Sequence, residues 1–351
     1  MYFQNRAKLR YANGPLAMAI YIFALISLLL PSIMKVHREL AGSLPEFQKA
    51  VVTIGTFDGV HLGHRKIIDQ MKLEARAIGG ETVIITFHPH PRKIVSSVPG
   101  DIRLLTTLPE KIDLLDEAGV DHLVVVPFDH RFSNQTAEEY VRDFLYRYFK
   151  PHTVIIGYDH RFGKGREGTY ELMDTYGKTL GFDVKEISEQ LLNEVAISST
   201  RIRHAIAEND IETSRLLLGH PYFFEGLVVE GNKLGRTIGY PTANLHISSE
   251  EKLIPGNGVY AVTVEQKGED DQFSGKQFKG MMNIGFRPTV DGKKKVIEVN
   301  IFDFDGDLYG KTLRIHLHNY LRGEVKFNGI DELKQQLAKD KITATDLLGH
   351  Q

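Results

Sequence analysis

Short β-branched runs separated by longer amphipathic segments constrain the fold of this chain more than any other feature. The first half of the sequence holds four such runs, at residues 51–54, 83–87, 123–126 and 153–156. Strands that alternate with helical segments build parallel βαβ units. The stretch from Val51 to about Val184 is therefore predicted to form a doubly wound α/β domain around a parallel sheet.

Local signals mark the helix boundaries in this half. Thr107 and Thr136 each precede a glutamate by three residues, which predicts a capping box at both helix starts. Residues 202–218 read as a single helix, which the glycine and proline of GHPY at 219–222 would end.

The pattern changes after Phe223. Short alternating segments follow one another, separated by turns rich in glycine, aspartate, asparagine and lysine, and they predict a small antiparallel β-barrel. Residues 267–277 are expected to be a polar hairpin loop, and residues 331–340 a closing helix. We expect one domain over residues 34–218 and a second over 219–351.

Residues 1–33 differ from the rest of the chain. A basic start precedes an apolar run from Leu16 to Leu30, which is shorter than the roughly 18 to 20 residues that a membrane-spanning helix needs. We interpret this extension as a mis-assigned start, with the protein beginning at Met34. A membrane anchor and a secretion signal are the alternatives, and membrane contact is expected only if the apolar run is genuine.

Composition excludes several classes of protein. The chain is 42% apolar and 25% charged, as is typical of globular proteins. Its formal net charge of -2 argues against bulk nucleic-acid binding. Cysteine is absent, which excludes disulfides, thiolate zinc sites and cysteine nucleophiles and fits a reducing, cytoplasmic location.

The sequence GTFDGVHLGH directly follows the first predicted strand. Doubly wound sheets bind ligands at the carboxyl ends of their strands, and the free N–H groups of a helix N-terminus suit phosphate. Gly55 and Gly59 would let the backbone approach a ligand closely. His61 and His64 would share one face of the helix start, where imidazoles can stabilise the charge that develops in phosphoryl or nucleotidyl transfer. A glycine-rich turn with surface histidines is the alternative.

Two further stretches favour a nucleotide site at the same sheet edge. GYDHRFGKGREG at 157–168 follows the fourth strand, and ISSTRIR at 197–203 opens a helix with three hydroxyls and two arginines. The usual phosphate loop is missing, because the YGKT sequences at 176–179 and 309–312 lack the required earlier glycine. We expect both YGKT sequences to be turns, and FDFDGD at 302–307 to be a turn rather than a calcium loop.

These motifs together resemble a known family. In the first half, the motifs that occur in the order of the nucleotidyltransferase superfamily are HLGH at 61–64, FHPHP at 87–91, the loop at 157–163 and ISSTRIR. In the second half, those that resemble the riboflavin kinase barrel are GNKLGRTIGYPTANL at 231–245, NIGFRPTV at 283–290, IEVNIFDFDGDLYG at 297–310 and LRGEVKF at 321–327. From about residue 35 to about 345 the chain is thus similar to bacterial bifunctional riboflavin kinase/FAD synthetases. That similarity implies a Rossmann-like nucleotidyltransferase domain followed by a riboflavin kinase barrel.

The resemblance implies that the first domain transfers AMP from ATP to FMN, releasing pyrophosphate and forming FAD. His61 and His64 would contact the ATP phosphates and stabilise the transition state. The other residues that would shape the ATP site are Gly55, Phe57, Asp58, Asp159, Arg161, Phe162, Ser199, Thr200 and Arg201. His160 stands where the family usually has phenylalanine, a change we interpret as tolerated. His88 and His90 would shape a loop on the flavin side, without a metal.

By the same resemblance the second domain phosphorylates the 5′-hydroxyl of riboflavin with ATP. Glu298 matches the catalytic base, and a polar residue on the outer face of a strand is the alternative. Thr242 and Asn244 would hold Mg²⁺ and phosphate, since a hard cation prefers oxygen ligands. The remaining residues expected around ATP and flavin are Gly231, Gly235, Gly239, Arg322 and Glu324. Asn300 replaces the His or Tyr that the family often has there.

Two other functions stay open at this point. The first domain could adenylylate or cytidylylate a different phosphate, or the chain could be a flavin- or nucleotide-binding regulator without catalysis. The barrel motifs argue against the first alternative, and the presence of His64 and Glu298 argues against the second. The expected partners are riboflavin, FMN and ATP rather than nucleic acid. The oligomeric state is left open, a homo-oligomer included.

Overall fold

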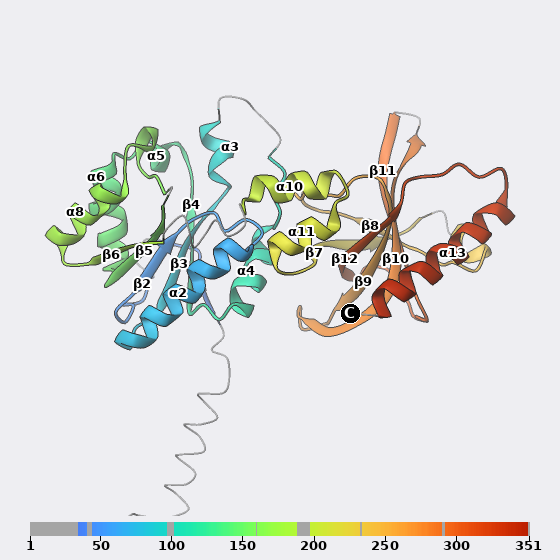
Figure 1. The fold of residues 1–351 in the computed structure, drawn as a ribbon, viewed down its shortest axis with the longest axis horizontal. Coiled ribbons are helices and arrows are strands. Elements are labelled where there is room, and N and C mark those ends of the chain that lie inside the picture. Colours follow the sequence, from blue (N-terminus) through green and yellow to red (C-terminus); the bar gives the residue numbers. More distant parts are fainter. Residues whose placement is uncertain are drawn as a thin grey trace, which may run out of the picture.

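The computed structural model describes residues 34–40, 44–96, 102–158, 160–187, 197–231, 234–289 and 292–349. A parallel α/β sheet and a closed antiparallel barrel lie side by side, joined by a pair of helices (Figure 1). The apolar run from Leu16 to Leu30 falls outside the described residues. Within them, no helix has the length and apolar character needed to cross a membrane.

The first domain has a six-stranded sheet of order β1-β4-β3-β2-β5-β6, and every neighbouring pair is parallel, as predicted. Its strands are β1 (Lys35–His37), β2 (Val51–Ile54), β3 (Thr82–His88), β4 (His122–Pro127), β5 (Thr153–Gly157) and β6 (Asp183–Ile187). Side chains alternate between two cores: Val51 packs on one face of the sheet, and Val52 and Ile54 pack on the other. Apolar cores on both faces explain the nearly continuous apolar runs in the sequence.

Helices cover both faces of this sheet. They are α2 (Leu62–Ile78), α3 (Pro91–Val95), α4 (Leu108–Glu117), α5 (His130–Ser133), α6 (Ala137–Glu139), a π-helical segment (Tyr140–Tyr146), α7 (Arg147–Phe149), a 3₁₀ turn (Lys164–Arg166) and α8 (Tyr170–Leu180). Both capping boxes form: Thr107 caps α4 together with Glu110, and Thr136 caps α6 together with Glu139.

Two local predictions are wrong. The YGKT sequence at 176–179 lies inside α8 rather than in a turn. Gly177 serves packing there, because a Cβ atom would come within 2.6 Å of the Phe182 carbonyl oxygen. Residues 202–218 form two helices, α10 (Ser199–Ala207) and α11 (Ile211–Leu218). The break occurs where Asn209 takes a φ of 64° and the Asp210 side chain caps α11.

The second domain is a closed barrel of order β10-β11-β8-β7-β12-β9 with antiparallel pairing, as predicted. Its elements are β7 (Tyr222–Val229), α12 (Leu234–Thr237), β8 (Ala243–His246), β9 (Gly258–Lys267), β10 (Phe273–Thr289), β11 (Gly292–Ile301), β12 (Thr312–Arg322) and α13 (Ile330–Gly349). The hairpin loop is shorter than expected, since β9 reaches Lys267 and β10 begins at Phe273. The closing helix is longer and reaches Gly349.

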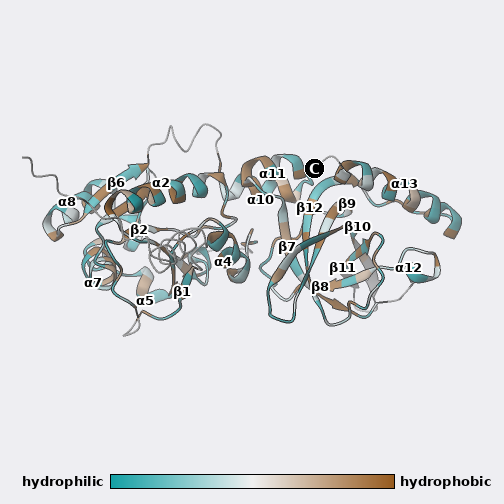
Figure 2. Ribbon diagram, turned by 90° about the horizontal axis from the view of Figure 1, so that it is seen from below, coloured by the Kyte–Doolittle hydropathy of each residue, from teal (hydrophilic) through white to brown (hydrophobic). Residues whose placement is uncertain are grey.

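The barrel interior is filled with apolar side chains. Tyr260, Val262 and Val264 of β9 join Met282 and Ile284 of β10 in one buried cluster, to which α10 and α11 also contribute. A separate cluster joins α13 to the outer wall of the barrel through Ala344 and Leu348. Figure 2 shows α2, α11 and α13 along one side of the molecule, each with mixed polar and apolar residues. A ligand of this domain must therefore bind outside the barrel wall.

Candidate active sites

A cavity of about 500 Å³ opens at the carboxyl edge of the parallel sheet. The ends of β2 and β5 and the starts of α2 and α10 form its walls, so three segments far apart in the sequence meet there. Five of the predicted residues line it: Gly55, Phe57, His61, His64 and Ser199. Gly63, Tyr158, His160 and Ile197 also line it. The three motifs therefore surround one space, as the strand pattern predicted.

The loop that enters α2 has an unusual backbone. Phe57, Gly59 and Val60 have φ angles of 47°, 83° and 39°. A positive φ is costly for a β-branched residue such as valine, and such conformations persist only where their surroundings hold them. At Gly59 a Cβ atom would lie 2.8 Å from the Leu105 side chain, so the loop also packs too closely for a larger residue.

His61 and His64 form a stacked pair in this cavity. Their ring centroids are 3.7 Å apart with 13° between the planes, and His61 Nδ1 accepts a 3.4 Å hydrogen bond from the His64 N–H. Burial lowers the pKa of His61 to about 4 and also lowers that of His64. His64 Nδ1 is buried and has no hydrogen-bond partner among the described residues. The free protein thus presents neutral imidazoles, one with an unsatisfied nitrogen.

Stability should fall in acid because of this burial. Between pH 6.5 and about 4 the unfolded chain binds a proton at His61 that the folded chain does not. The free energy of unfolding therefore has its full value above that range and declines as the pH drops through it. Urea unfolding at about pH 7.5 and about pH 5 should show a loss near 2 kcal/mol from this residue. His61→Gln should lose correspondingly less unfolding free energy between these two pH values. The exposed control His204→Gln should show the pH dependence of the wild type. An unchanged pH dependence in His61→Gln would contradict the assignment.

Three predicted residues of this domain line neither this cavity nor the one beside it. The Asp58 carboxylate is buried beneath the loop, where it accepts hydrogen bonds from the N–H groups of Leu105 (3.1 Å) and Thr106 (2.9 Å) and pairs with Arg203 at 2.5 Å. Thr200 and Arg201 are exposed on the first turn of α10. Asp159 is outside the described residues. Sequence reasoning missed the role of Arg203, the second arginine of ISSTRIR.

A second cavity of about 610 Å³ adjoins the first. The two share Ile54, Gly55, Thr56 and His160 as lining residues. The predicted residues Arg161 and Phe162 line this second space. Its other walls are aromatic and basic, formed by Phe87, Phe128, Phe132, Tyr140, Arg92 and Arg166. His90 shapes the adjacent loop by capping α3 through a 3.2 Å bond from the Arg92 N–H. Aromatic walls and arginines suit a flat ring that carries a phosphate.

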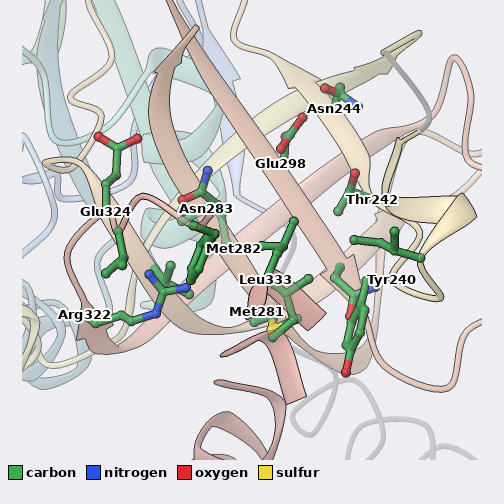
Figure 3. A pocket seen from close by; sticks show the side chains of 17 residues that line it. Tyr240, Thr242, Asn244, Met281, Met282, Asn283, Glu298, Arg322, Glu324 and Leu333 are labelled. Atoms are coloured by element: carbon green, nitrogen blue, oxygen red, sulfur yellow. The ribbon is translucent and has the colours of Figure 1, made fainter. Parts of the chain in front are cut away.

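The barrel carries a third cavity, of about 410 Å³, on its outer wall beneath α13 (Figure 3). Glu298, Thr242 and Asn244 group at one end of it, and Arg322 and Glu324 lie at the other. Strand pairing brings the first group together, because Glu298 of β11 lies opposite Asn244 of β8 and opposite Asn283 of β10. Apolar side chains complete the walls, among them Ile238, Tyr240, Met281, Leu333 and Leu337.

Glu298 does lie on the outer face of its strand. Its neighbours Ile297 and Val299 point into the core, so Glu298 and Asn300 point away from it and into the wall of this cavity. Asn300 Nδ2 donates a 2.6 Å hydrogen bond to the Pro241 carbonyl and thereby fixes the segment that carries Thr242. Glu298 is thus a polar residue on the outer face of its strand, as the alternative interpretation held. That outer face forms the wall of the cavity.

The glycines around this cavity differ in their roles. Gly235 lines the cavity, and a Cβ atom there would lie 2.2 Å from the Tyr240 carbonyl oxygen. A Cβ atom at Gly231 would lie 2.2 Å from Asn244 Nδ2, so glycine lets the chain pass closely over that amide. Gly239 has a φ of 85°, which favours glycine. The hydroxyl of Thr242 and the amide oxygen of Asn244 offer the oxygen donors that Mg²⁺ prefers.

Arg322 is held by a residue that sequence reasoning missed. Its guanidinium makes three contacts of 2.6–3.1 Å with the buried carboxylate of Asp340 on α13, which also accepts a 2.8 Å bond from Gln336. This pair fixes α13 against β12 and orients Arg322 at the cavity. Asp340 belongs to no sequence motif. Only its position on the inner face of α13 could have indicated that it binds Arg322.

Breaking this pair should destabilise the barrel and its cavity. Asp340→Ala leaves the Arg322 guanidinium without its buried partner, and we expect a loss of about 3 kcal/mol in unfolding free energy. The same variant should bind riboflavin, the substrate that the resemblance implies for this cavity, more weakly, as measured by quenching of flavin fluorescence. Lys339→Ala, on the exposed side of the same helix, is the matched control and should change neither quantity. Wild-type stability in Asp340→Ala would contradict this account.

Comparisons with known proteins agree for both halves of the chain. The FAD synthetase family profile matches residues 44–201, and the riboflavin kinase profile matches residues 218–348. The chain is similar to bifunctional riboflavin kinase/FMN adenylyltransferases. It is 40% identical over 299 residues to that of Escherichia coli strain K12, covering 85% of this chain and 93% of the relative. It is 38% identical over 304 residues to that of Bacillus subtilis strain 168, covering 85% and 92%.

The chain also matches a solved structure. A crystal structure described as a macrolide-efflux protein from Streptococcus pneumoniae superposes with a TM-score of 0.79 and 30% sequence identity. The match covers 89% of this chain and 99% of that one. It shows that both domains and their arrangement occur together in another chain.

Proposed function

The chain belongs to the bifunctional riboflavin kinase/FMN adenylyltransferase family, and we propose that it makes FMN in the barrel cavity and FAD at the sheet edge. One observation carries the two-site assignment. Glu298, Thr242 and Asn244 line a cavity of the barrel domain, whereas the stacked His61–His64 pair lines a separate cavity in the sheet domain. Each reaction therefore has its own set of chemical groups, and the two can be tested independently.

In the barrel cavity, Glu298 would accept the proton of the riboflavin 5′-hydroxyl. The hydroxyl oxygen then bonds to the γ-phosphorus of ATP while the bond from that phosphorus to the β-phosphate oxygen breaks, giving FMN and ADP. Thr242 and Asn244 would hold Mg²⁺, which supplies neutralisation of phosphate charge when it is bound. The apolar wall around Met281 and Leu333 suits the isoalloxazine ring.

At the sheet edge, the phosphate of FMN would attack the α-phosphorus of ATP and expel pyrophosphate, which forms FAD. We place ATP in the His61–His64 cavity and the flavin in the aromatic cavity beside it. The shared wall at Gly55 and Thr56 would bring the FMN phosphate towards the α-phosphate. Neutral imidazole N–H groups would hydrogen-bond the phosphates as charge develops, and Ser199 offers a hydroxyl at the start of α10. Positioning and charge stabilisation suffice for such an in-line transfer.

The test uses residues 34–351. We propose that the enzyme works in the cytoplasm and that its two domains meet near Leu218. The purified protein is incubated with riboflavin, ATP and Mg²⁺, and the products are separated by chromatography with flavin fluorescence. We expect FMN first and FAD later. Folded protein that binds flavin but forms no FMN would overturn the kinase assignment, and FMN that is never converted to FAD would overturn the adenylyltransferase assignment.

A further inference from the structure

The backbone of the strained histidine loop is held from outside its own helix. The Gly59 N–H donates a 3.0 Å hydrogen bond to Thr106 Oγ1, and Nε2 of His220 lies 3.1 Å from the Gly59 carbonyl oxygen. One residue earlier, the Asp58 carboxylate accepts bonds from the N–H groups of Leu105 and Thr106. Of these partners, His220 lies two residues before β7, so the barrel end of the chain touches the loop itself.

A residue of the barrel domain fixes the segment that carries those partners. Lys252 lies between β8 and β9, and its Nζ is 2.6 Å from the Leu105 carbonyl oxygen and 2.6 Å from Glu110 Oε2. Both side chains of this ion pair are 1% exposed. The ammonium also lies 4.7 Å from the centre of the Tyr222 ring, and the Leu105 side chain packs in the barrel core.

We propose that Lys252 and His220 are positioning residues for FMN adenylylation, although both come from the kinase half of the chain. Lys252 fixes Leu105, whose N–H fixes Asp58, and His220 fixes the next residue, Gly59. Two residues further on, His61 begins the catalytic pair. In Figure 1, α4, α10 and α11 lie between the sheet and the barrel, so this contact runs through the domain interface.

A second ion pair at the same interface joins the barrel to the sheet domain without contacting the histidine loop, so it serves as a comparison. Arg314 of β12 contacts Asp113 of α4 and also pairs with Glu225 of β7 at 2.5 Å. Asp113 lies one turn after Glu110 on the same helix, but within the described residues its carboxylate binds Arg314 and contacts neither residues 104–106 nor the histidine loop. If the barrel only docked to the sheet, the two ion pairs would be equivalent for adenylylation. The proposal predicts that they differ.

The test rests on the proposed function and compares paired variants. Glu110→Gln/Lys252→Met removes both charges of the buried pair, so that neither is left unpartnered. Thr106→Val removes the hydroxyl that holds Gly59, and Thr106→Ser restores it. Asp113→Asn is the matched interface control. For each protein, kcat and KM are measured for FAD formation from FMN and for FMN formation from riboflavin, alongside the thermal midpoint.

We expect the double variant and Thr106→Val to lose about tenfold to a hundredfold in adenylylation kcat, because small displacements of catalytic groups have effects of that size. The FMN KM and the kinase kcat should stay within about twofold, and Thr106→Ser and Asp113→Asn should resemble wild type. Wild-type adenylylation in a folded double variant would overturn the proposal, as would equal losses in both activities. Wild-type protein that forms no FAD from FMN would instead refute the proposed function.

Discussion

His64→Ala is expected to lower FAD formation from FMN by about a thousandfold, whereas FMN formation from riboflavin stays within about twofold of wild type. The His64 ring is stacked on His61 and lines the ATP cavity, and its Nδ1 is buried without a partner in the described part of the chain. A buried, neutral donor already in place needs no rearrangement when phosphate charge develops. Its removal should therefore affect the transition state more than substrate binding, and kcat should fall more than KM changes.

The control for this variant is His204→Ala, which changes an exposed histidine on α10. It should leave both activities unchanged. The kinase rate of His64→Ala reports on folding of the barrel, and circular dichroism reports on the sheet domain. If folded His64→Ala forms FAD at the wild-type rate, the histidine pair is not the adenylyl-transfer site.

Glu298→Gln is expected to have the converse effect. Glutamine keeps the shape of the side chain but cannot accept the proton of the riboflavin hydroxyl, so FMN formation should fall by about a thousandfold. FAD formation from supplied FMN should be unaffected, because the cavity with His61 and His64 lies in the other domain. Both rates are measured by chromatography of flavins.

An exposed carboxylate serves as the comparison for Glu298. Glu250→Gln, in the segment after β8, should phosphorylate riboflavin as wild type does. A Glu298→Gln protein that still forms FMN at the normal rate would show that another group accepts the proton. A variant that loses both activities in parallel would show that Glu298 acts on folding instead.

The sequence was sufficient for those parts of the structure that depend on local pattern. β-Branched runs predicted the parallel strands, and alternating segments predicted the barrel. The spacing of threonine and glutamate predicted the starts of α4 and α6. The motifs also predicted which segments would meet, since strand ends in a parallel sheet share one edge. Glu298 and Asn244 lie opposite each other for a similar reason, because they are register partners on adjacent strands.

The errors and omissions involve contacts between distant parts of the chain. Position 177 holds glycine within a helix because the Phe182 carbonyl leaves no room for a Cβ atom, and no spacing rule contains that contact. Asp58 belongs to the histidine motif, but the sequence could not show that its carboxylate binds Leu105, Thr106 and Arg203 instead of lining the cavity. The Lys252–Glu110 pair joins residues 142 positions apart. Only tertiary packing brings such charges together.

The most direct test of the central claim follows the phosphorus atoms of ATP. Residues 34–351 are supplied with riboflavin, Mg²⁺ and ATP labelled at either the α- or the γ-phosphorus, and the label in each flavin is counted after chromatography. Two sites with different chemistry predict γ-label in both FMN and FAD, α-label in FAD alone, and one ADP and one pyrophosphate released for each FAD formed. FAD without γ-label, or FAD formed without pyrophosphate, would contradict the account.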